Sequence, residues 1–184
     1  MHHVATRAFL VLTAAAFGAG AAEAQVGLTS NTAQVSINAT KNSTLSVAVT
    51  SGATQTLATL TDNTTNNFPT PVAITTTWDL NAGASVALVG WFATPANALV
   101  SGGNSITSSQ VKASLNGSPT FNAFNGAAVG GVGTAGGSLQ IFSAATPPLA
   151  SSRNDNLALQ IDLTATTLVP GTYSGTLNLQ AVVQ

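Results

Sequence analysis

The chain has 184 residues, with only four Lys and Arg, five Asp and Glu, no cysteine and a net charge of −1. Without cysteine, the chain has neither a disulfide framework nor thiolates for catalysis or for a zinc site. Its few positive charges do not form the basic patch that nucleic acids or anionic lipids bind, so we expect neither as a partner.

Residues 1–24 have the pattern of an export signal. His2, His3 and Arg7 form a short basic start, residues 8–22 are mostly apolar, and Ala22-Glu23-Ala24 matches an A-x-A cleavage site. The apolar run is shorter than the ~20 residues of a membrane-spanning helix, and no second such run follows. We therefore predict one exported domain, residues 25–184, without a membrane span, located in the periplasm, at the cell surface or outside the cell.

The first half of the predicted domain alternates apolar and polar residues in short runs. Residues 33–50 resemble a hairpin, since residues 35–39 and 45–49 both alternate, and residues 54–61 are a candidate short strand. Residues 71–80 form a clear strand that directs Trp78 into the core. Residues 85–93 are apolar at both parities, which predicts a strand covered on both faces or lying beneath a loop.

The second half continues with strands and turns, and no segment has a convincing helical pattern. Residues 110–124 suggest a weak hairpin around Asn116-Gly117, a dipeptide suited to a type I′ turn. Six glycines fall within residues 126–137. A strand follows at 138–142, then a loop at 144–155. Residues 157–164 and 177–183 alternate again and are joined by a tight corner.

Short strands separated by Gly, Pro and Asn predict an all-β protein. Parallel strands need long, usually helical, crossover connections, and the sequence shows none. We therefore expect an antiparallel β-sandwich, immunoglobulin-like or jelly-roll-like.

The ionisable residues give little support for catalysis. Both histidines precede residue 25, so a serine nucleophile in the predicted domain has no histidine base. Asp155 and Asp162 are the carboxylates closest in sequence. However, we expect Asp162 on the polar face of a strand and Asp155 beside Arg153 in a loop, which is a poor arrangement for glycoside hydrolysis. We predict no catalytic residue.

We also predict no metal and no cofactor. Residues 62–67 and 154–156 contain Asp and Asn that could supply oxygen ligands to calcium, but Asx turns explain them more simply. Residues 131–136 match G-x-G-x-x-G. This motif binds dinucleotides only where it follows a strand and opens a helix, and here a strand-like segment follows it.

Aromatic side chains are the candidates for ligand contact. Trp91 and Phe92 are adjacent in sequence and so face opposite sides of a strand. One of the two is therefore a candidate for exposure, and we select Trp91. Phe121 and Phe124 flank Asn122-Ala123, just before the glycine-rich segment. We take Trp91, Phe121 and Phe124 as possible contact residues, although core packing is the favoured interpretation of each.

The C-terminal segment LVPGTYSGTLNL, residues 168–179, resembles the ending of secreted pilin-like β-sandwiches, particularly the spore coat protein U and chaperone–usher pilin group. The resemblance implies an incomplete sandwich that is completed by a strand from the next subunit. The donor would be residues 25–34, with Val26 and Leu28 as its alternating apolar side chains.

Two functions from different classes remain open. The first is an exported structural subunit of a bacterial surface fibre, pilus or coat, which associates with itself or with other surface proteins. The second is a self-contained immunoglobulin-like module that binds carbohydrate or a surface protein through Trp91 or residues 121–137. A hydrolase that uses the aspartates is a distant third.

Overall fold

The computed structural model describes residues 30–145 and 149–184, and the chain divides into two compact units, Met1–Ala39 and Thr40–Gln184. The predicted export signal lies outside the described residues. Residues 30–39, which we call the N-terminal arm, have no regular secondary structure. The described part of the chain is 45% strand and 4% helix, and its second unit is the predicted antiparallel β-sandwich. The sandwich unit begins at Thr40.

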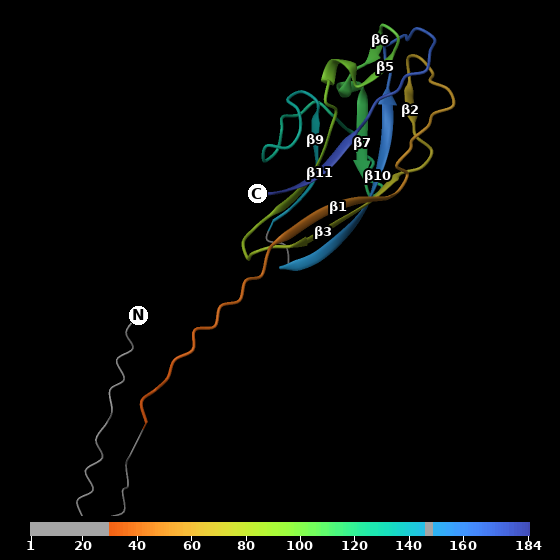
Figure 1. Cartoon of the computed structure of the whole chain (residues 1–184). Coiled ribbons are helices and arrows are strands. Elements are labelled where there is room, and N and C mark those ends of the chain that lie inside the picture. The colour runs from red at the N-terminus through yellow and green to blue at the C-terminus, as the bar shows by residue number, and fades with distance from the viewer. Residues whose placement is uncertain (1–29, 146–148) are drawn as a thin grey trace, which may run out of the picture. The chain divides into compact units, whose positions relative to one another are not determined.

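The larger sheet, sheet A, has the strand order β1-β3-β10-β7-β8, with β2 paired to the C-terminal end of β10. Its strands are β1 (Thr44–Ser51), β2 (Thr65–Asn67), β3 (Val72–Asp79), β7 (Val111–Leu115), β8 (Asn122–Ala123) and β10 (Ala150–Asp162). In Figure 1 the long β10 curves along this sheet. All of its strand pairs are antiparallel.

The smaller sheet, sheet B, has the order β11-β4-β9. Its strands are β4 (Val86–Trp91), β9 (Ser138–Ala144) and β11 (Asn178–Val183). A separate hairpin of β5 (Leu99–Ser101) and β6 (Asn104–Ile106) lies at one end of the sandwich (Figure 1). Two 3-10 turns, η1 (Pro95–Asn97) and η2 (Ser108–Gln110), complete the regular structure of the described residues.

The core lies between the two sheets and follows the period-two pattern of the sequence. On β3 every second residue from Val72 to Trp78 is buried, and on β10 the buried residues include Leu157, Leu159 and Ile161. Sheet B contributes the core side chains on the other side, including Val86, Leu88 and Ala181. The strand predicted at 71–80 and the inward direction of Trp78 are confirmed.

Strand β4 is covered on both faces, as its two-sided apolar sequence predicted. All five residues from Val86 to Gly90 are buried. One face packs into the core, and the glycine-rich segment lies over the other. A Cβ at Gly130 would approach Val182 Cγ2 to 2.8 Å, which shows how closely this segment packs on sheet B. Gly130 and Gly131 have φ of 57° and 81°, and a two-residue type I′ hairpin turn requires positive φ at both of its central residues.

The same segment contains the G-x-G-x-x-G match, and the structure rules out its dinucleotide reading. Residues 131–136 lead directly into β9, a strand, so no helix N-terminus faces the glycines. The other predicted turn, at Asn116-Gly117, is present. Both residues have positive φ, 51° and 75°, and Ser118 N–H donates to the Leu115 carbonyl at 3.0 Å.

Three predicted elements are wrong. The hairpin at 33–50 does not form, because β1 pairs with β3 and residues 35–39 are not a strand. Residues 54–61 form no strand either. The predicted loop at 144–155 is largely strand, because β10 begins at Ala150. The inward positions near this end of β10 are polar or charged, so the apolar alternation that marks a strand is absent there although pairing with β3 continues.

The corner that joins β10 to β11 carries the chain from sheet A to sheet B. Tyr173 Oη donates a hydrogen bond to the Val169 carbonyl at 3.0 Å, an arrangement like the tyrosine corner of immunoglobulin-type sandwiches. Leu168 N–H donates to Asp62 Oδ1 at 3.0 Å, and Ser174 exchanges two backbone bonds with Val100. These contacts set the point at which β11 enters sheet B.

Candidate functional site

Strand β11 leaves one side of sheet B unpaired, since within the described residues it pairs only with β4. Gln184 and Ser85 exchange both of their backbone hydrogen bonds, at 3.2 and 2.9 Å. Antiparallel ladders bond alternate residues, so the even-numbered residues of β11 bond β4. Leu179, Ala181 and Val183 therefore direct their N–H and C=O groups toward the open side.

This edge lacks the features that usually protect a free strand. Its sequence, Asn-Leu-Gln-Ala-Val-Val, contains no charged residue and no proline, and its register with β4 shows no bulge. Natural proteins commonly use such features to prevent unwanted pairing at an edge. An unprotected edge of six residues is therefore a template for another strand.

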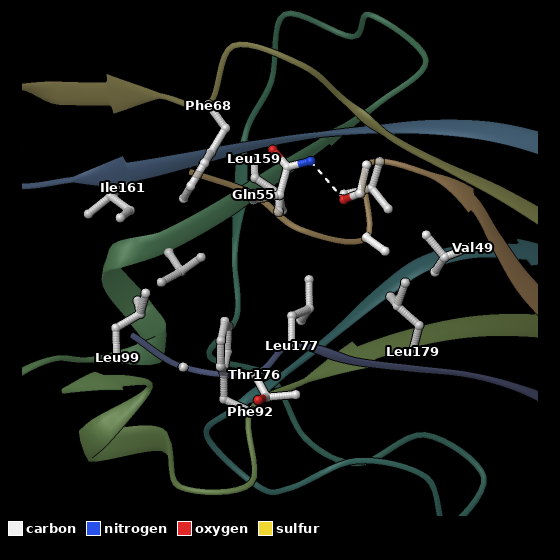
Figure 2. A pocket seen from close by; sticks show the side chains of 15 residues that line it. Val49, Gln55, Phe68, Phe92, Leu99, Leu159, Ile161, Thr176, Leu177 and Leu179 are labelled. Carbon is white, nitrogen blue, oxygen red and sulfur yellow. Dashed lines mark hydrogen bonds between the residues drawn. The ribbon is translucent and has the colours of Figure 1, made fainter. Parts of the chain in front are cut away.

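An apolar groove of about 300 Å³ lies beside this edge. β1 and β11, the edge strands of the two sheets, contact each other along the same side of the sandwich. Figure 2 shows the side chains that surround the groove. They come from the end of β1, the segment before β11, and the core: Val49, Gly52, Ala53, Gln55, Phe68, Val72, Phe92, Leu99, Val111, Leu159, Ile161, Gly175, Thr176, Leu177 and Leu179.

The groove reaches the core itself. Phe92, Val111 and Ile161 line it, although each is at most 4% exposed. No side chain in its lining is charged. A wider hollow of about 610 Å³ beside the 168–175 corner shares Phe68 and Leu99 with the groove. A strand with alternating apolar side chains matches this lining, because every second side chain of an added strand would point into the groove.

Gln55 gives the groove one unsatisfied polar atom. Its Nε2 donates to the Gly52 carbonyl at 2.8 Å, the bond drawn in Figure 2. Its Oε1 is buried and accepts no hydrogen bond from any described residue. Buried polar atoms are rarely left unpaired in native proteins. The groove thus offers one acceptor to a donor that the described part of the chain does not supply.

The charged residues lie away from the groove lining, and all of the described ones except Asp62 form ion pairs: Lys41–Asp79, Lys112–Asp162 and Arg153–Asp155. The hydrogen bond from Lys112 Nζ to Asp162 Oδ2, at 2.6 Å, is the main reason that the pKa of Asp162 lies well below its usual range. Bonds from the Thr164 hydroxyl and N–H to Asp162 Oδ1 lower this pKa further. These pairs join neighbouring strands or residues and do not converge on one site.

The two aspartates considered for hydrolysis do not face each other. Asp155 points into the sandwich and is 3% exposed, whereas Asp162 lies at the opposite parity of the same strand. Arg153 Nε donates to both carboxylate oxygens of Asp155, at 3.0 and 2.7 Å, and Asn116 Nδ2 donates to Oδ1 at 2.7 Å. The Arg153 guanidinium also stacks 4.3 Å from the Phe142 ring centroid. The geometry of Asp155 is that of a structural ion pair.

The structure separates the three aromatic residues that we selected as contacts. Phe124 is fully buried and packs edge-to-face on Phe92, with ring centroids 5.4 Å apart, so its prediction as a contact residue is wrong. Trp91 and Phe121 are partly exposed. Trp91 shares the outer face of sheet B with Val89. The predicted donor residues Val26 and Leu28 lie outside the described residues.

Groups of His, Cys, Asp or Glu that could hold a metal ion do not occur among the described residues. The same part of the chain contains no helix of the length and apolar character needed to cross a membrane. Compared with models of protein families, with curated proteins and with solved structures, the chain matches none.

Proposed function

We propose that this chain is an exported, non-catalytic structural subunit of a bacterial surface fibre, pilus or coat, and that its subunits join by strand addition at β11. The observation that carries the proposal is the coincidence of an unprotected strand edge with an apolar groove that reaches the core. An added strand would satisfy the outward backbone groups of Leu179 and Ala181 and cover the groove with its alternate side chains.

The resemblance of residues 168–179 to secreted pilin-like sandwiches supports the same proposal. The composition favours a structural role as well, because the predicted mature chain lacks both histidine and cysteine. The buried Asp155 is fully engaged with Arg153 and Asn116, which leaves little carboxylate chemistry for a substrate.

The test is the native mass of the full-length chain, measured by light scattering over a range of concentrations, together with electron microscopy of any large species. We expect concentration-dependent oligomers or filaments. Ala181→Pro should leave the fold intact but stop assembly, because the proline removes an N–H that points to the open side. A chain that stays monomeric at every concentration would contradict the proposal.

Gln180→Pro is the matched control for the edge variant. Residue 180 bonds β4, so proline there removes a ladder bond inside sheet B and should destabilise the sandwich by about 1–3 kcal/mol, the cost of an unpaired buried carbonyl. Circular dichroism and thermal unfolding of the two variants separate loss of assembly from loss of fold. If Ala181→Pro assembles like the unmodified chain, the open edge is not the joining surface.

The alternative is a self-contained binding module, and the partial exposure of Trp91 favours it. In that case the chain would be a stable monomer, and Trp91→Ala would weaken binding to a polysaccharide in a glycan screen without changing the fold. Intrinsic tryptophan fluorescence during titration with the polysaccharide measures this binding. Assembly that depends on residue 181 and not on residue 91 would decide against the alternative.

A further inference from the structure

Asp62 is the one charged side chain in the described part of the chain that forms no ion pair. Its Oδ1 accepts a hydrogen bond from the Leu168 N–H at 3.0 Å, whereas no described residue donates to its Oδ2. The backbone just before it is fixed as well, because Thr61 exchanges two hydrogen bonds with the Asn66 side chain, at 2.8 and 2.9 Å. The Asp62 carboxylate is therefore held in place, with one oxygen available to a ligand.

This carboxylate lines the hollow beside the 168–175 corner, and the hollow adjoins the apolar groove. Five residues line both spaces: Gln55, Phe68, Leu99, Ile161 and Gly175. Figure 2 shows Leu99 and Ile161 at the end of the groove that lies opposite Val49. Among the described residues of the two linings, Asp62 is the only Asp, Glu, Lys, Arg or His. A negatively charged hollow thus lies beside one end of an uncharged, apolar groove.

The unpaired polar atoms of these two spaces are hydrogen-bond acceptors. Gln55 Oε1 is buried and accepts no hydrogen bond from any described residue, and Asp62 Oδ2 accepts none either. A ligand that satisfies both atoms must therefore supply donors. An ionised carboxylate offers only acceptors, and its charge would be repelled by Asp62. An ammonium group offers three N–H donors and the opposite charge, so it matches both atoms.

We infer that the hollow and the groove together bind an amine that carries an unbranched apolar chain. The ammonium group pairs with Asp62 in the hollow, and the apolar chain lies in the groove. Phe68 and Tyr173 also line the hollow, and aromatic rings attract cations. The volumes of the two spaces, about 300 and 610 Å³, are those of small-molecule sites. The site lies within one chain, so the inference does not rest on strand addition at β11.

The first test compares head groups on one apolar chain. The full-length protein is titrated in a calorimeter with octylamine, octan-1-ol and octanoate, each below the concentration at which it forms micelles. We expect octylamine to bind about fivefold more tightly than octan-1-ol, the effect of a partly exposed ion pair. Octanoate should bind more weakly than either, because its charge is repelled by Asp62. Octanoate that binds as tightly as octylamine would overturn the inference.

The second test varies the length of the apolar chain, with butylamine, hexylamine and octylamine as ligands. Each buried CH₂ group raises affinity about fourfold, so each step of two CH₂ groups should raise it about 15-fold. An affinity that does not rise beyond butylamine would show that the site takes only an ammonium group on a short stem. The groove would then not be part of the site, and the inference would be wrong.

The third test removes the charge of the hollow. Asp62→Asn should lower the affinity for octylamine about fivefold, while its amide oxygen can still accept the Leu168 N–H. Asp79→Asn is the matched control, because it removes the same charge at a residue outside both linings. It should bind octylamine like the unmodified chain. An equal loss of affinity in the two variants would mean non-specific attraction of the amine and would contradict the site.

Ala53→Trp tests the groove without a change near Asp62. Ala53 is exposed and lines the groove but not the hollow, so an indole there should fill space that the apolar chain needs. The affinity for octylamine should fall more than the affinity for butylamine. An octylamine affinity that Ala53→Trp leaves unchanged would contradict the placement of the chain in the groove.

These titrations use dilute protein and need no assembly, so this inference and the proposed function fail separately. Octylamine binding by a chain that never assembles would support the inference and contradict the proposed function. Assembly that Ala181→Pro stops, in a chain that binds no octylamine, would contradict the inference and support the proposed function.

Discussion

Replacing Asp155 with asparagine should strongly destabilise the sandwich. The Asp155 side chain is 1% exposed and accepts three charge-assisted or amide hydrogen bonds, from Arg153 Nε and Asn116 Nδ2. Asparagine keeps one acceptor oxygen and replaces the other by an NH₂ group, so one of these donors would face a second donor instead of an acceptor. Breaking a buried ion pair costs about 3–5 kcal/mol. Because the Arg153 side chain is 35% exposed and water can solvate it, we expect the lower end, about 3 kcal/mol.

Urea unfolding followed by circular dichroism measures this loss, and the melting temperature should fall by roughly 6–12 °C. Asp79→Asn is the internal control. It breaks the ion pair between Asp79 and Lys41, whose side chains are 27% and 74% exposed respectively, and should lower the free energy of unfolding by less than about 1 kcal/mol. If Asp155→Asn loses no more stability than Asp79→Asn, the argument from burial is wrong.

Three further changes test other parts of the structure. Thr76 is fully buried and its Oγ1 has no hydrogen-bond partner among the described residues, so Thr76→Val should stabilise the sandwich by about 1–2 kcal/mol in urea unfolding. Thr77→Val, on the exposed face, is the control and should change stability by less than about 0.5 kcal/mol. Because the pKa of Asp162 is lowered in the folded protein, Asp162 contributes to folding stability above its unfolded pKa of about 4, and this contribution is lost as the pH falls below that value. Asp162→Asn should therefore lower the free energy of unfolding by about 1 kcal/mol at pH 7 and by progressively less below pH 4. A cost that does not depend on pH would contradict the role of Lys112. Tyr173→Phe removes the hydroxyl bond of the corner and should lower the free energy of unfolding by about 1 kcal/mol, and no change would show that the corner bond is dispensable.

The open edge of β11 is not protected by any neighbouring strand of sheet B in the described part of the chain. An exposed, uncharged strand beside an apolar groove promotes association unless a specific partner covers it.

Local sequence pattern was sufficient for those elements whose periodicity reflects burial. The alternation around Trp78, the two-sided apolar run of β4 and the Asn116-Gly117 turn each predicted the observed structure, because side-chain direction and turn conformation depend mainly on neighbouring residues. The same reasoning predicted the all-β class. It also placed apolar residues at the inward positions of β10 and β11.

Tertiary structure decided which strands pair, because pairing depends on contacts between distant residues that a local pattern does not contain. Residues 35–39 and 45–49 alternate alike, yet only the second segment is a strand, paired with β3. Arg153 and Asp155 looked like a polar loop, and only pairing with β3 made them part of β10. The groove likewise arises where β1 and segments before β11 meet, from residues more than a hundred positions apart. The sequence by itself therefore determined the strands and their faces, and the packing of the two sheets created the open edge.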